Sequence, residues 1–334
     1  MRNAIASLAC AAVGFAVPVG AGASQAMTAA GSSCASSPCM YISNAVNYSK
    51  GSVTVYPLSA RHHHLPVEKI EGRDTRLAWP ASIAVDASRN IYVANVRPIN
   101  QFSITAYAAG SSGDAQPMLD IAGSNTVLYF PASILLDASA NIYVGDDSSA
   151  IRIFAAGSNG NIAPMATIAG ADTGLNFPSG LAFDAAGNIY AGNQYFRGGT
   201  VTVYPAGQTG DVLPMQTIAG SYTGLWDVYG VAVDAQGNIY VANCTAQNIL
   251  VFAAGATGNV APIRTISGPD TGLSWPAGVS VAPDGTLYVT NGAGLYGANS
   301  ITVYAPAANG DAKPLRTLVG RAMGLNHPYG IAIH

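Results

Sequence analysis

Residues 178–220 read PSGLAFDAAGNIYAGNQYFRGGTVTVYPAGQTGDVLPMQTIAG, and this pattern recurs along most of the 334-residue chain. Its most regular mark is a tyrosine that follows an apolar residue, as in Ile189-Tyr190. This tyrosine recurs every 47 to 51 residues, at Tyr41, Tyr92, Tyr143, Tyr190, Tyr240 and Tyr288. A repeat of about this length, built from strands alone, is typical of β-propellers, in which each repeat forms one blade.

Each repeat contains four short apolar runs. In the quoted stretch they cover residues 180–184, 188–193, 200–204 and 215–218. Alternation is clear in the third run, where Thr202 separates Val201 from Val203, and a two-residue period indicates a strand. Turn residues, mainly Gly, Asp, Asn and Pro, bound every run. One repeat therefore predicts four antiparallel strands, which are the content of one propeller blade.

The order of the runs predicts how the ring closes. Named A to D from the channel outward, each type of run occurs six times, but the chain begins with B, C and D and ends with a single A run in residues 327–334, HPYGIAIH. An unpaired strand would leave an open sheet edge, so we expect this run to complete the first blade. The sequence predicts an all-β fold over residues 39–334, a six-bladed β-propeller with one-plus-three closure by the C-terminal strand.

Residues 1–26 have the three parts of a secretory signal peptide. Arg2 supplies the positive end, residues 4–19 form a short apolar core, and small residues follow up to Ala26. Residues 27–38, MTAAGSSCASSP, have the composition of a flexible linker. We therefore expect a periplasmic or secreted monomer that has no membrane span after cleavage of the signal.

The charge and the cysteines of the chain indicate which partners and which disulfides to expect. The chain carries 14 Lys and Arg against 17 Asp and Glu and contains no basic run, which argues against a nucleic-acid partner. Export permits disulfides. Cys34 and Cys39 are close enough in sequence to pair, and we expect Cys244 to keep its thiol.

Aspartates and asparagines recur in the connections between strands. An Asp or Asn that opens a tight turn accepts hydrogen bonds from its own backbone, so we interpret these residues as turn caps rather than metal ligands. The A-to-B turns contain Asp86, Asp137, Asp184 and Asp234, and the C-to-D connections contain Asp114, Asn161, Asp211, Asn259 and Asp311. His62, His63 and His64 also lie in a C-to-D connection, and we interpret them as a solvated turn.

The D-to-A and B-to-C connections share one face of the propeller, which we call the top face, and they vary in length and sequence. Variable loops on a rigid scaffold are a common place for binding. Two rings of residues converge there. A polar ring ends the B strands and consists of Asn44, Asn95, Asp146, Asn193, Asn243 and Asn291. A second ring, mostly aromatic, precedes the A strands and consists of Trp79, Phe130, Phe177, Asp227, Trp275 and His327.

The positions at which a ring breaks its own pattern are the strongest candidates for a site. Asp227 and His327 replace aromatic residues, and Asp146 is the one carboxylate of the polar ring. The candidate ligand-binding set is Trp79, Asn95, Asp146, Asn193, Asp227, Tyr229, Asn243, Trp275, Asn291 and His327. The alternative stays open, in which the polar ring caps turns and the aromatic ring packs between blades.

The pattern P-x-G-I/V-A-V-D-x-x-G-N-I-Y-V-A-N, followed by I-T-V-Y, resembles the NHL repeat of exported bacterial propellers over residues 40–334. The resemblance implies a six-bladed fold, which is shared by binding modules, by lactonases of the gluconolactonase type and by peptide-amide lyases. It implies a channel metal on Glu, Asn and Asp in the lactonases, but Glu68 and Glu71 do not map to the matching strand ends. The lyases resemble one another in using several histidines, whereas in this chain only His327 reaches the channel mouth.

Two functions are compatible with these observations. The first is a binding scaffold without a cofactor, whose top face holds a small molecule, a glycan or a protein. The second is a metal-dependent hydrolase, lactonase or lyase, in which a divalent cation activates water or polarises a carbonyl. Its ligands would be Asp146, Asn193, Asp227 and His327. We favour the binding scaffold because the sequence lacks the dense set of ligands that such an enzyme needs.

Overall fold

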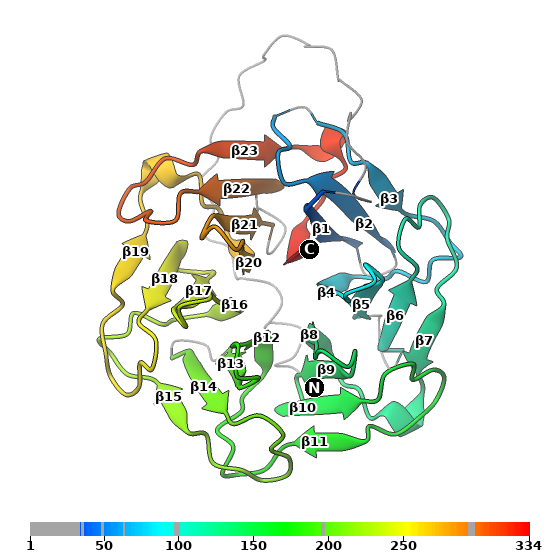
Figure 1. Ribbon diagram of the computed structural model, residues 1–334, viewed down its shortest axis with the longest axis horizontal. Helices are drawn as coiled ribbons and strands as arrows, with labels where there is room; N and C mark the ends of the chain where they lie inside the picture. The colour runs from blue at the N-terminus through cyan, green and yellow to red at the C-terminus, as the bar shows by residue number, and fades with distance from the viewer. Residues whose placement is uncertain are drawn as a thin grey trace.

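The computed structural model describes Cys34 and residues 37–47, 50–62, 64–96, 101–194, 198–292 and 298–334. Six four-stranded antiparallel sheets stand around a central channel as the blades of a propeller (Figure 1). The predicted fold is therefore confirmed. The predicted signal peptide, residues 1–26, and most of the predicted linker lie outside the described residues.

The blades follow one another along the chain, and the strands of each are ordered from the channel outward. Blade 1 contains β24 (Pro328–Ile333), β1 (Cys39–Asn47), β2 (Lys50–Pro57) and β3 (Glu68–Ile70). Blade 2 contains β4 (Pro80–Val85), β5 (Ile91–Asn95), β6 (Ser103–Tyr107) and β7 (Leu119–Ala122), and blade 3 contains β8 (Pro131–Leu136), β9 (Ile142–Asp146), β10 (Ala150–Phe154) and β11 (Ala166–Ile168). Blade 4 contains β12 (Pro178–Phe183), β13 (Ile189–Asn193), β14 (Thr200–Tyr204) and β15 (Gln216–Ile218). Blade 5 contains β16 (Val228–Val233), β17 (Ile239–Asn243), β18 (Asn248–Phe252) and β19 (Arg264–Ile266), and blade 6 contains β20 (Pro276–Val281), β21 (Leu287–Asn291), β22 (Ser300–Tyr304) and β23 (Arg316–Val319).

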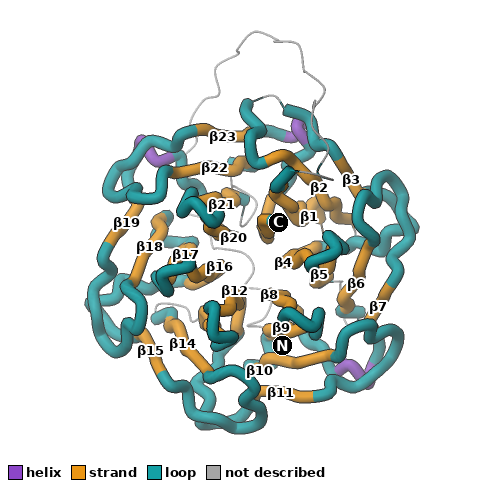
Figure 2. Tube along the Cα trace, in the orientation of Figure 1, coloured by secondary structure: helices purple, strands orange, loops and turns teal. Residues whose placement is uncertain are grey.

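Helical structure in the described residues is confined to short 3₁₀ turns at the rim (Figure 2). They are η1 (Ser124–Thr126), η2 (Pro269–Thr271) and η3 (Arg321–Met323). Within this part of the chain, no helix has the length and apolar character needed to cross a membrane.

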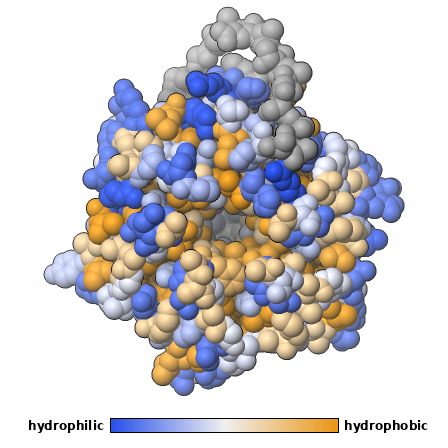
Figure 3. All heavy atoms as spheres, viewed as in Figure 1, coloured by the Kyte–Doolittle hydropathy of each residue, from blue (hydrophilic) through white to orange (hydrophobic). Residues whose placement is uncertain are grey.

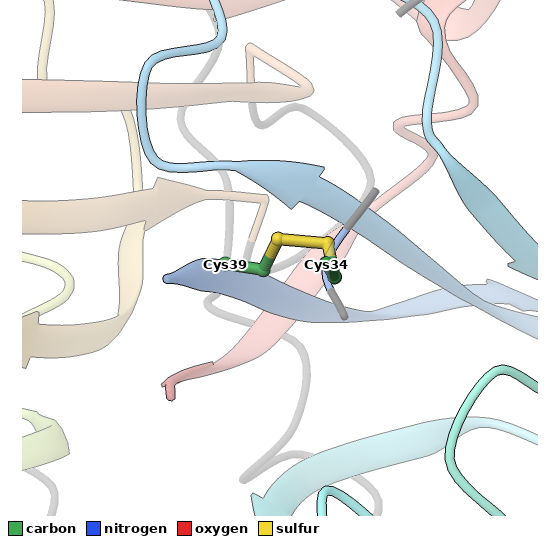
Figure 4. Close-up of a disulfide and its surroundings, with 2 residues drawn as sticks. All are labelled: Cys34 and Cys39. Atoms are coloured by element: carbon green, nitrogen blue, oxygen red, sulfur yellow. A yellow bond between two sulfur atoms is a disulfide. The ribbon is translucent and has the colours of Figure 1, made fainter. Parts of the chain in front are cut away.

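The C-terminal strand closes the ring as predicted. β24 pairs antiparallel with β1, with Ile331 opposite Ile42. The pairing continues beyond the strand, because the Cys39 N–H donates to the His334 carbonyl at 2.8 Å and the His334 N–H donates back at 3.0 Å. Cys39 also forms the expected disulfide with Cys34 (Figure 4). The disulfide therefore anchors the segment before β1 at the point where the ring closes.

The core lies between neighbouring blades. All five residues of β17 are buried, because both faces of a blade are covered by its neighbours. One cluster joins Val201 and Val203 of blade 4 with Val231 and Val241 of blade 5. A strand covered on both faces needs apolar residues on both, which explains why the B runs are nearly continuous rather than alternating.

The aspartates of the A-to-B turns cap their own backbone, as predicted. Asp184 is representative, since its Oδ1 accepts from the N–H groups of Ala186 and Asn188, each at 2.9 Å. Asp86, Asp137 and Asp234 accept in the same way.

The polar residues of the C-to-D connections have a different role. Asp211 accepts from the N–H of Asp172 in the preceding D-to-A connection at 2.8 Å, beside a parallel bridge between Ile168 and Gly210. Asp114, Asn161, Asn259 and Asp311 accept equivalent bonds. These residues tie adjacent blades together, so the prediction that they cap their own turns is wrong. The C-to-D connection is long enough to reach the preceding blade.

Candidate functional site

The polar ring lies at the ends of the B strands, and all six of its side chains are buried. Asn95 is representative: its Oδ1 accepts from the N–H of Ala78 at 3.3 Å, and its Nδ2 donates to Thr105 Oγ1 at 2.9 Å. Asn44, Asn193 and Asn291 repeat both bonds with Thr54, Thr202 and Thr302. The ring therefore joins the loop before each A strand to the B and C strands of the same blade. A ligand-binding role for Asn95, Asn193 and Asn291 stays a prediction.

Two blades depart from this arrangement. In blade 5, Asn243 donates to Asn248 Oδ1 at 2.9 Å instead of to a threonine. In blade 3, Asp146 takes the place of asparagine, and Arg152 Nε donates to its Oδ2 at 2.6 Å. Burial raises the pKa of Asp146, while hydrogen bonding to Ser148 and the charge of Arg152 lower it. The break that the sequence shows at Asp146 therefore belongs to an internal ion pair.

The second ring contributes most of an aromatic collar around the channel mouth, the end of the channel at the top face. We define the collar as Trp79, Phe130, Phe177, Tyr229, Trp275 and Tyr329. The Tyr329 ring lies close to two other rings of the collar. Its centroid is 6.5 Å from that of Tyr229 and 6.2 Å from that of Trp79. Phe130 and Phe177 are 6.4 Å apart. Trp79, Phe130 and Trp275 pack against a buried cluster that contains both tyrosines.

The aromatic pattern is interrupted in blade 5, where Asp227 stands in place of an aromatic residue. Its Oδ1 accepts from Gln194 Nε2 at 2.9 Å, and its Oδ2 accepts from Thr245 Oγ1 at 2.7 Å. We call Gln194, Asp227 and Thr245 the polar notch. Asp227 is only 6 % exposed, and its own N–H donates to Asn243 Oδ1 at 3.0 Å. The carboxylate is thus held in a fixed orientation by groups from blades 4 and 5.

Three residues of the collar and one of the notch line the channel. A cavity of about 320 Å³ runs between the A strands, and Phe177, Gln194, Tyr229 and Tyr329 are among its lining residues. The space-filling view is drawn from the face of the A-to-B turns, and it shows a hollow at the end of the channel opposite the mouth, bordered in part by hydrophobic residues (Figure 3). The site therefore combines aromatic side chains with oriented polar groups at the end of a channel cavity, and small-molecule pockets use both kinds of group.

Sequence reasoning identified Asp227 and Tyr229 but missed Gln194 and Thr245. Gln194 directly follows the polar ring, and the same position holds Ala45, Val96, Asp147, Cys244 and Gly292 in the other blades. Comparing this position across the repeats would have singled out Gln194 and Asp147 as its polar members. Cys244 is a buried thiol in the tyrosine cluster, as expected.

Asp147 is the acidic counterpart of Gln194 in the neighbouring blade. Its N–H donates to the Tyr129 carbonyl at 2.9 Å, as the N–H of Gln194 donates to the Phe177 carbonyl at 3.1 Å. The carboxyl is half-buried. Burial, followed by the nearby charge of Asp146, raises the pKa of Asp147 to about 6.

The predicted metal ligands are not gathered into one group. Among the described residues, no three His, Cys, Asp or Glu side chains lie together as a metal site would require. The backbone of His327 is engaged at the closing seam, where its N–H donates to Asn299 Oδ1 at 2.6 Å. Of the histidine run, His62 is exposed with its Nδ1 3.2 Å from the Thr317 carbonyl oxygen, and His63 lies outside the described residues.

Comparison with known proteins supports the fold. No protein-family model matches the chain, and a search of curated proteins finds no similar sequence. Among solved structures, a protein of unknown function from Bacteroides caccae matches with a TM-score of 0.60 and 13 % identity, over 89 % of this chain and 99 % of that one. A protein from Lactobacillus plantarum matches with a TM-score of 0.55 and 13 % identity over the same shares, and the RRP9 WD40 repeats match with a TM-score of 0.50 and 13 % identity, over 69 % of this chain and 61 % of that one. At this identity the likeness shows the propeller fold alone.

Proposed function

We propose that this protein is an exported binding propeller of the NHL-repeat type that holds a small molecule at the channel mouth. One observation carries the proposal: the second ring, which is aromatic in blades 2, 3, 4 and 6, has Asp227 in blade 5, and this carboxylate is oriented by Thr245 and by Gln194, which lines the channel cavity. Export is supported by the disulfide between Cys34 and Cys39, because structural disulfides persist in oxidising compartments.

The shape of the mouth favours a small ligand over an extended partner. The channel cavity, which extends along the A strands from the mouth, has a volume of about 320 Å³, near the lower end of the range for small-molecule pockets, roughly 300–1,000 Å³. Its aromatic residues supply area for an apolar ligand body, while the notch supplies oriented polar groups. Strand pairing holds each blade together and buried packing joins blade 4 to blade 5, so the site is preorganised and little ordering is needed on binding.

Intrinsic fluorescence is a direct test, since the three tryptophans, Trp79, Trp226 and Trp275, all lie in D-to-A connections of the top face. The mature protein would be titrated with a library of metabolites, monosaccharides and short glycans. We expect a saturable fluorescence change for at least one compound, with a matching rise in melting temperature. Adding calcium, magnesium or zinc to the same melt tests the metal-dependent alternative.

Two variants and one control locate the binding. Tyr229→Ala removes a collar face, and Asp227→Asn keeps the shape of the notch while removing its charge. Tyr222→Ala is the control, because Tyr222 lies in the same D-to-A connection but is 74 % exposed. Binding that survives in the Tyr229→Ala and Asp227→Asn proteins, or that is lost in the Tyr222→Ala protein, would place the ligand away from the mouth and contradict the proposal.

A further inference from the structure

We infer that this protein has a second binding site, for a small organic oxyanion, in a cleft on the rim of its top face. The oxyanion is a phosphate, sulfate or carboxylate group, which cationic side chains of the cleft hold. The described residues that line this cleft and those that line the channel cavity are different, so the site does not depend on the function proposed for the mouth.

The cleft lies between the B-to-C hairpin of blade 1 and the D-to-A connection that leads from blade 1 to blade 2. We call it the rim cleft. It is lined by residues 46, 50–51, 71–73 and 76–78 and has a volume of about 640 Å³, within the range of small-molecule pockets. Gly51, Leu77 and Ala78 are buried, whereas the charged residues of the lining are exposed. A ligand in the rim cleft therefore meets both apolar surface and charge.

The rim cleft is open because small residues replace a bulky pair. In blade 2, Phe102 of the B-to-C connection packs against Tyr129 of the following D-to-A connection, with ring centroids 5.6 Å apart. Gly51 directly precedes the residue that faces the polar-ring asparagine of blade 1, as Phe102 does in blade 2. Ala78 is two residues before the proline that begins an A strand, as Tyr129 is. The space that two rings fill in blade 2 is therefore available in blade 1.

Charged residues interrupt the repeat beside this opening. Residues 70–78 read IEGRDTRLA, where the connection between blades 3 and 4 reads IAGADTGLN. Glu71, Arg73 and Arg76 thus replace two alanines and a glycine, and all three line the rim cleft. Arg76 has a φ of 58°, in the left-handed region that favours glycine. An arginine at a position that costs backbone strain indicates a role other than stability.

Two cations of the rim cleft have no carboxylate partner. Glu71 pairs with Lys69 at 2.6 Å, and Arg76 pairs with Asp120 of β7 at 2.5 Å. Lys50 and Arg73 form no ion pair with the described residues. All 17 Asp and Glu residues of the chain are among the described residues. The charges of Lys50 and Arg73 are therefore available to a ligand.

Two further carboxylates lie close to the rim cleft but not in its lining. Asp114 accepts from the N–H of Asp74 at 2.7 Å, and the Asp74 side chain is exposed. Through water, charges that are not in contact attract or repel each other weakly. The side chains that line the rim cleft therefore determine which ligand it binds.

An oxyanion gains from these cations, whereas other ligand classes do not. A guanidinium can form two parallel hydrogen bonds with a carboxylate or a phosphate, and an ammonium group adds a compact charge. Lys50 and Arg73 would repel a cation. A neutral molecule would gain nothing from their charges. The buried Leu77 and Ala78 favour an anion that is part of an organic molecule over a bare ion, because they offer apolar contact to its body.

The test compares anions with a neutral molecule of similar shape. The probes are inorganic phosphate, inorganic sulfate, glucose 6-phosphate and glucuronate, and glucose is the neutral partner of the last two. Binding to the mature protein is measured by isothermal titration calorimetry at low salt. We expect glucose 6-phosphate or glucuronate to bind saturably and at least about tenfold more tightly than glucose. The order of the anions shows which oxyanion the rim cleft prefers.

Variants assign the binding to the rim cleft. Arg73→Gln and Lys50→Gln should each weaken anion binding by roughly tenfold with the fold retained, because each removes one exposed cation. Ala78→Tyr gives blade 1 the tyrosine of blade 2, so it should fill the cleft and abolish binding. Arg61→Gln is the matched control: it removes an exposed arginine from the C-to-D connection of the same blade and should leave the affinity unchanged.

Several results would overturn this inference. They are failure of all four anions to bind, equal affinity for glucose and its two anionic relatives, and anion binding that Arg73→Gln and Lys50→Gln leave intact. A loss in the Arg61→Gln protein as large as that in the Arg73→Gln protein would mean diffuse attraction and would overturn it too. Tyr229→Ala alters the channel mouth and should not change anion binding. Anion binding that depends on Tyr229 but not on Arg73 would move the anion to the mouth, against this inference and in favour of the proposed function.

Discussion

Arg152 binds Asp146 through a 2.6 Å hydrogen bond at the place where blades 1, 2, 4 and 6 set a threonine against an asparagine. Both positions differ together in blade 3: a carboxylate replaces the amide and a guanidinium replaces the hydroxyl. The pair occupies the same register, since Arg152 faces Val144 as Thr105 faces Val93. The ion pair of Arg152 and Asp146 thus links the B and C strands of blade 3, as a neutral asparagine–threonine pair does in those four blades.

A double-mutant cycle tests this equivalence. Arg152→Thr alone leaves a buried carboxylate without its guanidinium and should cost roughly 3 kcal/mol, and Asp146→Asn alone should cost about 2 kcal/mol. The double variant restores the pair of the other blades, so it should lie within about 1 kcal/mol of the wild type. Urea unfolding of the four proteins measures the coupling, and purely additive losses would show that the two residues do not act as a pair.

The tyrosines that end four of the C strands should each stabilise the loop before their blade. The Tyr204 hydroxyl donates to the carbonyl of Thr173 at 2.6 Å, whereas blades 3 and 5 carry Phe154 and Phe252 at the same position. Tyr204→Phe leaves that carbonyl without its donor, so unfolding should become easier by about 1 kcal/mol. The exposed Tyr222→Phe is the control, and equal effects of the two substitutions would show that the buried bond contributes nothing.

Asp147 should make the protein less stable as pH rises from about 4 to about 6. Its pKa is raised to about 6 from an ordinary value of 3.8, so the folded state holds the proton more tightly than the unfolded state, and the free energy of unfolding falls through this window. The carboxyl is only half-buried, which limits the loss at pH 7 to about 1 kcal/mol. Asp147→Asn should therefore stabilise the protein at pH 7 but not at pH 4. A difference that is the same at both pH values, or larger at pH 4, would contradict this account.

The disulfide between Cys34 and Cys39 should contribute modestly to stability. The bond closes a loop with a sequence separation of only 5 residues, so its loss should cost about 1–2 kcal/mol, toward the low end for disulfides. Cys34→Ser should lower the melting temperature as much as dithiothreitol does in the wild type. A further drop when dithiothreitol is added to the Cys34→Ser protein would mean that another bond is responsible.

The fold was predictable because each blade repeats its own local signals. The interval between tyrosines such as Tyr190 and Tyr240, together with the lone A run at the C-terminus, determined the number of blades and their closure. That the B strands are buried on both faces was harder to predict, because this depends on how tightly neighbouring blades stack.

The candidate site was predictable only where it interrupts the repeat. Asp227 and Tyr229 were visible as breaks in an aromatic pattern. Gln194 and Thr245 were not, because they join Asp227 only when the ring brings blades 4 and 5 together. Arg152 was within reach of sequence reasoning, since aligning the C strands places it among threonines, but its partner would have to be inferred from strand register.

The proposed function requires that this protein bind its ligand at the channel mouth. A crystallographic screen measures this directly: crystals of the mature protein are soaked with the compounds of the fluorescence library. We expect density for a bound compound at the mouth, against Tyr229 and Tyr329 and within reach of Gln194 and Asp227. Compounds bound reproducibly at the rim or at the opposite end of the channel, with the mouth empty, would contradict it.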